Sequence, residues 1–424
     1  MGALRVDHPD ILEFVAAKRA PGAFTNFNLS VAVTDRFMEA VLADETYELI
    51  HPRHGRAAHR LRARTVFEAI VQAAWETGDP GLLYLDAIAR ANPTASLGEI
   101  ETTNPCGEVP LLPWESCVLG SVNLAHMVRI EDGAPAIDWK RLRHAVHTGI
   151  RFLDDVIEVN RDPLPAIAAA TRATRKIGLG VMGFAECLIR LGVAYGTHEA
   201  VAWADRLVGF IADEACAASR TLAEERGVFS AWPQSVHAAR DDRRRNATLL
   251  SIAPTGTLGI LAGTSAGIEP LYALAYRRAH TLGGEPLVEL NPIFERWATE
   301  HRPDAPALLS AVTAAGTLAG ADVPDAVRGL FVTATELDVD QHLAVQHAFQ
   351  RHVDNAVSKT INLPEDAPPD AVRRAYLEGW RLGLKGVTVY RSGSRPAQVL
   401  ILGLGGDPSA REHFARCDAG ACRL

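Results

Sequence analysis

The sequence lacks long apolar runs. No stretch approaches the roughly 18 consecutive apolar residues that a membrane-spanning helix needs. Charged residues also interrupt the first 18 positions, so this segment does not have the apolar core of a signal peptide. We therefore expect neither a membrane partner nor secretion.

Cysteine is scarce, with 6 in 424 residues. So few thiols in a chain without a signal peptide argue against a disulfide scaffold and for a cytoplasmic protein that uses thiols chemically. An excess of basic residues is also missing, since 43 Lys and Arg stand against 51 Asp and Glu, a net charge of −8. Nucleic acid is therefore not an expected partner, and the arginine run at 243–245 is interpreted as a solvated loop.

Apolar residues make up 48% of the chain, enough for a large core. Helical spacing alternates with short β-branched or glycine-rich runs, a pattern typical of an α/β sheet or barrel. Helices are predicted at 9–19, 35–44, 64–77, 139–160, 196–226, 341–351 and 368–382, and buried strands at 29–33, 177–182, 248–252 and 386–389.

Smaller features complete the predicted organisation. Asp35 is expected to cap the helix that follows it. The Ala-, Pro- and Gly-rich residues 301–330 indicate an insertion or a less regular excursion. We expect one catalytic domain over residues 1–400 and a flexible tail over 401–424.

The most informative segment contains Asn104, Cys106 and Glu108, with Cys117 following 11 residues after Cys106. In extended backbone, alternate residues point to the same side, which would bring an amide, a thiol and a carboxylate together. Glu108 could then act as a general base toward a hydroxyl, and Asn104 could hold a polar group. Cys106 could be a nucleophile, a metal ligand or a radical carrier. The spacing to Cys117 is poor for zinc, so we expect no metal here.

The residues alone leave the reaction open. A hydrolytic cysteine would need a histidine base nearby in space, which a sequence cannot exclude. Two ordinary buried cysteines in a proline-rich loop are an equally good interpretation. Cys187 and Cys216 lie in helical patterns and are expected to be core residues.

A second candidate site follows the apolar run 248–252 and consists of small and hydroxyl residues. At a strand-to-helix turn, such residues offer backbone N–H groups and hydroxyls to a phosphate. A plain turn would explain the same pattern. The residues are Ala253, Pro254, Thr255, Gly256 and Thr257.

The predicted tail carries Cys417 and Cys422, separated by small residues. Two such thiols on a flexible stem can form a reversible disulfide. A metal site with His413 as third ligand is the competing interpretation, although a structural zinc ion prefers four ligands.

The motif Asn104-Pro-Cys106-Gly-Glu108 resembles the active-site loop of the ribonucleotide reductase large subunit. The run TNPCGEVPLLPWESCVLGSVN (103–123) is similar to the adenosylcobalamin-dependent class in particular. Further blocks extend the resemblance over nearly the whole chain: LRVDHPDI (4–11), NFNLSVAVTD (26–35), ETGDPGLLYLD (76–86), RKIGLGVMGFAE (175–186), SKTINLP (358–364) and GLKGVTVYRSGSR (383–395).

The resemblance implies a partial ten-stranded α/β barrel with a flexible C-terminal tail. Because the family's large subunit is longer on its N-terminal side, part of the barrel is expected to be missing, which would leave strand edges unpaired. The missing part would include the second reducing cysteine that works with Cys117. It could be supplied by a separately encoded N-terminal segment.

The resemblance also implies roles for the motif residues. Cys106 would carry the thiyl radical that removes the 3′-hydrogen of a ribonucleotide, in a pocket shielded from water. Glu108 would take the 3′-hydroxyl proton, Asn104 would fix the hydroxyls, and Cys117 would be one of two reducing thiols. The turn Ala253 to Thr257 would cradle the substrate's di- or triphosphate.

Cofactor and partners follow from the same resemblance. Members that receive a radical from a second subunit carry adjacent tyrosines where this chain has only Tyr390, so adenosylcobalamin is the expected radical source. Cys417 and Cys422 would pass electrons from thioredoxin or a similar dithiol protein to the active site. A homodimer is possible. The alternative function is that of a non-catalytic remnant or nucleotide-binding paralogue.

Overall fold

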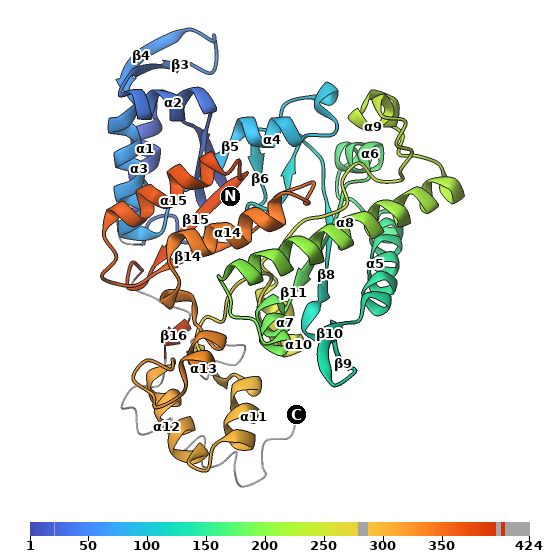
Figure 1. Cartoon of the computed structure of the whole chain (residues 1–424). Helices are drawn as coiled ribbons and strands as arrows, with labels where there is room; N and C mark the ends of the chain where they lie inside the picture. Colours follow the sequence, from blue (N-terminus) through green and yellow to red (C-terminus); the bar gives the residue numbers. More distant parts are fainter. Residues whose placement is uncertain (21, 279–286, 396–399, 403–424) are drawn as a thin grey trace.

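The computed structural model describes residues 1–20, 22–278, 287–395 and 400–402 (Figure 1). Its largest sheet has the strand order β1 (Gly2–Arg5), β2 (Leu29–Val33), β5 (Gly81–Tyr84), β15 (Gly386–Arg391) and β14 (Thr360–Leu363). β1, β2 and β5 are parallel to one another, and so are β14 and β15. The two groups meet in the antiparallel pair β5 and β15.

A second sheet continues this one. It pairs β8 (Val118–Asn123) with β11 (Ile177–Met182) in parallel. Residues 248–252 lie between the two sheets, because Leu250 forms a bridge with Leu179 and Ile252 forms a bridge with Val357, just before β14. The strands therefore form a continuous arc from β1 to β8, which does not close within the described residues. This matches the predicted partial barrel.

Close backbone approach inside the arc depends on a glycine. A Cβ atom at Gly180, on β11, would lie 2.3 Å from the carbonyl oxygen of Ser251. Any side chain at position 180 would therefore push the 248–252 segment away from β11. The glycine-rich pattern of residues 177–182 is thus a packing requirement of the arc.

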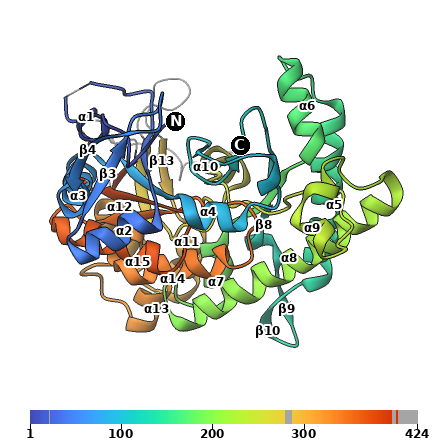
Figure 2. The same cartoon turned by 90° about the horizontal axis from the view of Figure 1, so that it is seen from above.

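Helices cover the outside of the arc: α3 packs against α2 and α15, α15 packs against α14, and α14 packs against α8, and Figure 2 shows them along one side of it. The helices are α1 (Ile11–Ala16), α2 (Asp35–Ala43), α3 (Ala63–Thr77), α4 (Leu85–Ala91), α5 (Trp139–Val159), α6 (Pro165–Thr174), α7 (Phe184–Leu191), α8 (His198–Arg226), α9 (Val236–Ala239), α10 (Gly256–Ala262), α11 (Pro292–His301), α12 (Ala305–Ala315), α13 (Asp325–Leu330), α14 (Val339–Gln350) and α15 (Pro369–Arg381). In the described part of the chain, no helix combines the length and apolar character needed to cross a lipid bilayer.

The remaining strands form short antiparallel pairs or a small sheet outside the arc. They are β3 (Thr46–Ile50) with β4 (Ala57–Arg62), β6 (Thr102–Thr103) with β7 (Pro110–Leu111), β9 (Val128–Glu131) with β10 (Ala134–Ile137), and β12 (Ala275–Arg278) with β13 (Leu287–Leu290) and β16 (Leu400–Leu402). β16 pairs with β12 at residues 400–402, next to the tail boundary predicted at 401.

The two largest hydrophobic cores of the described residues lie between the strands and the helices. One packs β1, β2, β5, β14 and β15 against α2, α3 and α15, and the other packs β8 and β11 against α5, α7 and α8. α14 joins them, since Leu343 belongs to the first core while Val345 and Phe349 belong to the second. The two halves of the arc are therefore packed as one body.

Two local predictions were wrong. The cap of α2 is Thr34, whose Oγ1 accepts a hydrogen bond from the Phe37 amide at 3.2 Å, while Asp35 is the first helical residue. Asp35 Oδ1 accepts a hydrogen bond from the Trp380 indole instead. Of the two interpretations of residues 301–330, the less regular excursion is wrong, because these residues contain α12 and α13, which Figure 1 shows in a lobe below the arc. The other interpretation, an insertion, stays a prediction.

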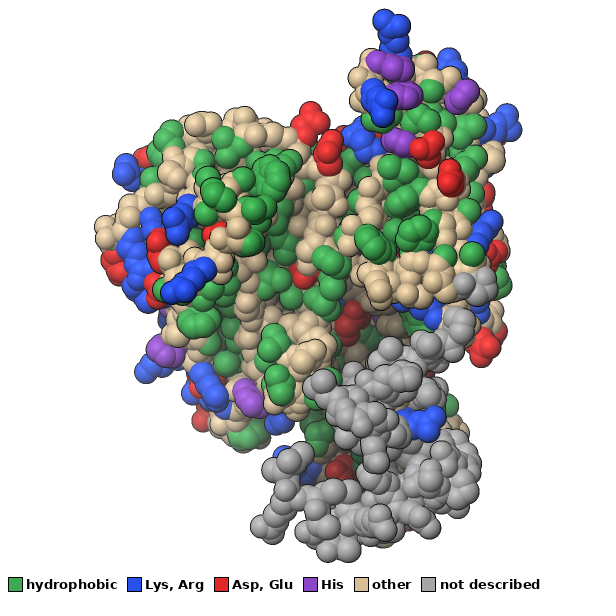
Figure 3. Space-filling model, turned by 180° about the vertical axis from the view of Figure 1, so that it is seen from behind, with side chains coloured by type: hydrophobic (Ala, Val, Ile, Leu, Met, Phe, Trp, Pro, Cys, Tyr) green, Lys and Arg blue, Asp and Glu red, His purple; other side chains and the backbone are tan. Residues whose placement is uncertain are grey.

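The arginine run 243–245 is only partly the solvated loop that was predicted, because Arg243 is exposed but the next two arginines are not. Arg244 is buried and pairs with Asp242, and Arg245 pairs with Asp154 and Glu158. Exposed basic residues gather elsewhere, on the β3–β4 hairpin, where Figure 3 shows Arg and His side chains projecting from the molecule. These include Arg53, Arg56, Arg60, His54 and His59.

Asp154 is the centre of a buried polar network. Its carboxylate accepts hydrogen bonds from Arg175 at 2.7 Å, Arg226 at 3.0 Å and Asn246 at 3.0 Å, and its side chain is fully buried. Replacing Asp154 with Asn should lower the free energy of unfolding by about 3 kcal/mol, because the buried Arg175 guanidinium would lose its fully buried counter-charge and keep only the half-exposed Glu158. Urea denaturation would measure the loss. Glu225→Gln, which breaks the exposed pair with Arg151, should leave stability nearly unchanged.

Candidate active site

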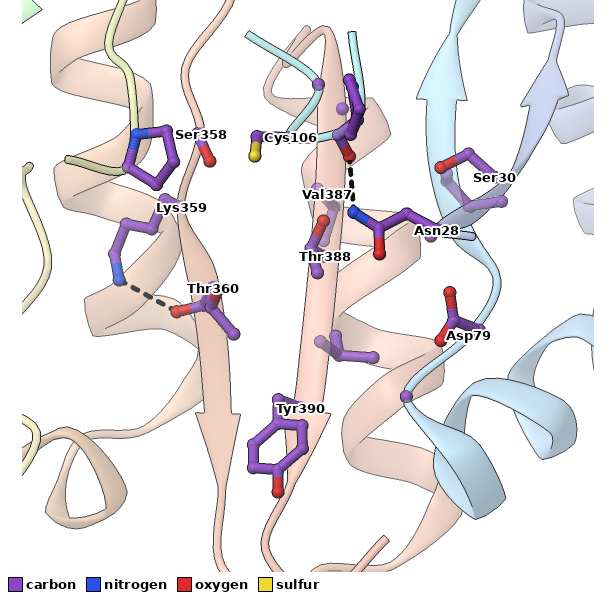
Figure 4. Close-up of a pocket in the computed structure, with 18 of the residues that line it drawn as sticks. Asn28, Ser30, Asp79, Cys106, Ser358, Lys359, Thr360, Val387, Thr388 and Tyr390 are labelled. Atoms are coloured by element: carbon purple, nitrogen blue, oxygen red, sulfur yellow. Dashed lines mark hydrogen bonds between the residues drawn. The ribbon is translucent and has the colours of Figure 1, made fainter. Parts of the chain in front are cut away.

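A cavity of about 450 Å³ opens inside the arc. Its walls come from the neighbouring strands β2, β5, β15 and β14, from the loop at 105–107 and from Pro254. Figure 4 shows Cys106 facing this space between Ser358 on one side and Asn28 on the other. The two motifs that the sequence singled out, around Cys106 and around Pro254, thus meet at one cavity.

The Cys106 loop connects β6 to β7 and is a tight turn. The Gly107 amide donates a hydrogen bond to the Asn104 carbonyl at 3.0 Å, and Gly107 has a φ of +84° that favours glycine. Asn104 Oδ1 accepts from the Val109 amide at 3.0 Å, and Asn28 donates to the Pro105 carbonyl at 3.0 Å. The extended backbone assumed from the alternating spacing is therefore wrong, although the turn still keeps the three residues close together.

Cys106 is exposed at the cavity. Partial burial, and then the nearby Glu108 carboxylate, raise the pKa of its thiol. The thiol is therefore protonated at neutral pH, with its S–H bond intact. The shielded position expected for it is not seen in this structure, in which Cys106 is exposed.

Glu108 lies beneath the cavity surface and is 2% exposed. Its backbone carbonyl accepts hydrogen bonds from Ser251 Oγ at 2.9 Å and from the Ala356 amide at 2.8 Å, which fix the loop to the arc. Its Oε2 atom has no hydrogen-bond partner. Burial raises the pKa of this carboxyl, while hydrogen bonds from its own backbone and from Asn104 act in the opposite direction. An unpartnered carboxylate oxygen is available to accept a proton.

Cys117 precedes β8 and does not line the cavity. Its Sγ atom lies 3.5 Å from where a Cβ on Gly178 would be. Burial strongly raises the pKa of this thiol; the Lys176 ammonium opposes the shift, and Glu108 adds to it. Cys117 is therefore a protonated thiol, and it is close enough to Glu108 for an electrostatic interaction.

The turn at 253–257 leads into α10, with Thr255 in the left-handed conformation at φ +50°. Thr255 Oγ1 accepts a hydrogen bond from the Gly267 amide at 2.7 Å, so this hydroxyl also has a structural role. Pro254 lines the cavity, and Gly256 and Thr257 are exposed. The turn thus presents exposed N-terminal residues of α10 beside the cavity.

The sequence predictions missed several residues at this cavity. Lys359 lines it from the start of β14 with a fully buried side chain, and Asn28 supports the Cys106 loop. Asp79 lines it too and pairs with Lys18 and Arg395. A lysine directly before an apolar strand was the only sequence signal for Lys359.

The other four cysteines differ in how deeply they are buried and in whether the structure describes them. Cys187 in α7 is fully buried in the core, as predicted, whereas Cys216 in α8 is only partly buried and accepts a hydrogen bond from Arg244. Cys417, Cys422 and the alternative ligand His413 lie outside the described residues. Among the described residues, no group of three or more His, Cys, Asp or Glu side chains is arranged to hold a metal ion.

Comparisons with known proteins agree with this geometry. The vitamin B12-dependent ribonucleoside-diphosphate reductase of Mycobacterium tuberculosis is 50% identical over 402 residues, which are 94% of this chain and 57% of that protein. The protein of the same name from Thermoplasma acidophilum is 47% identical, over 95% of this chain and 52% of its own length. The chain therefore spans little more than half the length of these relatives.

A solved structure has the same fold. The Actinobacillus ureae class Id ribonucleotide reductase alpha subunit superposes with a TM-score of 0.73 over 92% of this chain and 70% of its own, at 22% identity. The family described as "Ribonucleotide reductase, barrel domain" matches residues 1–243 and 240–390. The chain belongs to the ribonucleotide reductase family, and its matched residues correspond to the family's barrel domain.

Proposed function

We propose that this chain carries the catalytic centre for the reduction of ribonucleotides to 2′-deoxyribonucleotides by a thiyl-radical mechanism. The observation that carries the proposal is that one short turn holds an exposed thiol, Cys106, above an unpartnered carboxylate oxygen of Glu108. The names of the relatives favour a ribonucleoside diphosphate as the substrate.

Each residue of the turn has a role in this proposal. Cys106 removes the 3′-hydrogen of the ribose, and Glu108 takes the proton of the 3′-hydroxyl. Asn104 holds the hydroxyls, although its Oδ1 also supports the turn. Cys117 supplies one of the two thiol hydrogens and electrons needed when the 2′-hydroxyl leaves as water. The exposed residues Gly256 and Thr257, with the rest of the 253–257 turn, bind the phosphates.

Adenosylcobalamin would supply the radical that oxidises Cys106. The site fits such an external cofactor, because the Cys106 thiol is exposed rather than enclosed. Asn28, Pro105 and Gly107 surround it at the cavity and would form the adjoining contact surface. The names of the relatives state a dependence on vitamin B12.

The proposal includes partners for turnover. Cys417 and Cys422 would carry electrons from thioredoxin or a similar dithiol protein to the active site. A separately encoded N-terminal segment would complete the protein, since the relatives extend well beyond the matched part. A homodimer is part of the same proposal.

Direct assay tests the function. The chain, alone and with the N-terminal region of a relative supplied as a second polypeptide, would be incubated with adenosylcobalamin, CDP and dithiothreitol. We expect dCDP to form only when the cofactor is present, as measured by chromatography. CDP binding without any dCDP in either mixture would favour the alternative, a nucleotide-binding remnant.

A further inference from the structure

Lys359 is a buried cation in the wall of the cavity, and each of its ammonium protons has a hydrogen-bond acceptor. Its Nζ donates to Glu269 Oε2 at 2.9 Å, to His342 Nδ1 at 2.9 Å and to the Thr360 carbonyl at 3.1 Å. An ammonium group has three protons to donate, so this set satisfies it. The pair with Glu269 joins segments 90 residues apart in the sequence.

His342 is held as a neutral acceptor in this cluster. Its Nε2 lies 3.0 Å from the Ala334 carbonyl, which can only accept, so Nε2 carries the ring proton and Nδ1 is free to accept from Lys359. Burial, and then the Lys359 charge, lower the pKa of His342 well below its usual range. The histidine therefore orients Lys359 without competing for its charge.

Glu269 connects Lys359 to the 253–257 turn. Its second oxygen, Oε1, accepts from the Thr360 amide at 2.7 Å, so the carboxylate holds the start of β14 at two points. Two residues earlier, the Gly267 amide donates to Thr255 Oγ1. A Cβ at Gly267 would lie 2.9 Å from the Ala253 carbonyl oxygen, which shows how closely this turn packs on residues 253–255.

We propose that Lys359 and Glu269 are positioning residues that fix the 253–257 turn relative to the Cys106 cavity, and so determine the affinity for the phosphates of a nucleotide. The inference rests on the proposed function, in which this turn binds the phosphates. Neither residue needs to touch the reacting atoms. The ion pair acts by fixing the position of the 253–257 turn relative to the start of β14.

Binding measurements test the role. Calorimetry would compare CDP with cytidine on the 424-residue chain and on Glu269→Gln, Lys359→Met and the double variant. We expect about a tenfold or greater loss of CDP affinity, the equivalent of one hydrogen bond to a charged group, with cytidine affinity unchanged. Asp154→Asn is the control, because it removes a buried ion-pair partner that does not line the cavity.

The double variant separates positioning from folding. Removing both charges eliminates the unpaired ion that each single variant leaves, which is the buried Lys359 or the partly buried Glu269, so thermal stability should recover in part. CDP affinity should remain low, because the position of the turn relative to β14 is not restored. If the double variant or the single variants bind CDP as tightly as the unchanged chain, the inference is wrong. If the unchanged chain itself does not prefer CDP to cytidine, the phosphate assignment of the 253–257 turn fails as well.

Discussion

Replacing Cys106 with serine is expected to reduce ribonucleotide reduction to the background level while leaving CDP binding unchanged. Serine preserves the size and polarity of the side chain, so the turn from Asn104 to Val109 should keep its hydrogen bonds. A serine O–H bond is much stronger than a thiol S–H bond, and an oxygen radical would not form in its place. Product formation and calorimetric CDP binding would be measured on the same preparation.

Cys216→Ser is the matched control for this prediction. Cys216 is also a partly accessible thiol, but it lies in α8 and does not line the cavity. Its replacement should leave product formation intact. Measurable turnover by the Cys106→Ser variant would show that the radical assignment is incorrect. Loss of CDP binding in that variant would instead indicate that the thiol supports the cavity structurally.

Regular elements with a strong apolar period could be predicted well from the sequence. The helices observed as α3, α5, α8 and α15 begin and end within two residues of the predictions, because each buries one face against the arc. The segment 248–252, predicted as a buried strand, is buried but is not a regular strand. It forms only isolated bridges in the structure, partly because the Leu249 and Leu250 amides donate to the Asp354 side chain.

The parts that could not be predicted depend on long-range polar contacts. The pair between Lys359 and Glu269 and the network around Asp154 join residues that no local pattern relates. The same limitation explains the error for Arg245, which was predicted to be solvated but pairs with Asp154 and Glu158 in the folded chain. The motif residues were found by resemblance, whereas the tight turn that carries them was not.

Glu108→Gln should reduce the rate of ribonucleotide reduction by about 10²- to 10⁴-fold, the usual contribution of a general base. In the unchanged chain, the rate should fall as the pH drops through the raised pKa of Glu108, because the carboxyl must be charged to accept a proton. The variant should lack this acidic limb. A pH profile of kcat/KM for both proteins would test this, and undiminished reduction by the variant would contradict the assignment.

The same substitution should stabilise the fold at neutral pH, which distinguishes it from ordinary damage to the site. Burial raises the pKa of Glu108 in the folded chain, so its contribution to stability is full below the ordinary glutamate pKa of about 4.3 and is lost as the pH rises through the raised value. At neutral pH the charged form is buried with Oε2 unpartnered, and glutamine removes that charge. The Tm of Glu108→Gln should therefore exceed that of the unchanged chain at pH 7, with the difference shrinking toward pH 4.

Glu115→Gln is expected to have the opposite effect on stability. The Glu115 side chain is also buried, but its carboxylate accepts from Lys176 at 2.7 Å, from Thr174 at 2.8 Å and from the Leu112 amide at 2.8 Å. Neutralising it would leave the Lys176 ammonium buried without its counter-charge and should lower the Tm. Two buried glutamates seven positions apart would then respond in opposite directions to the same change. A lower Tm for both variants would mean that the Glu108 charge stabilises the fold. That result would contradict the role of Glu108 as the proton acceptor.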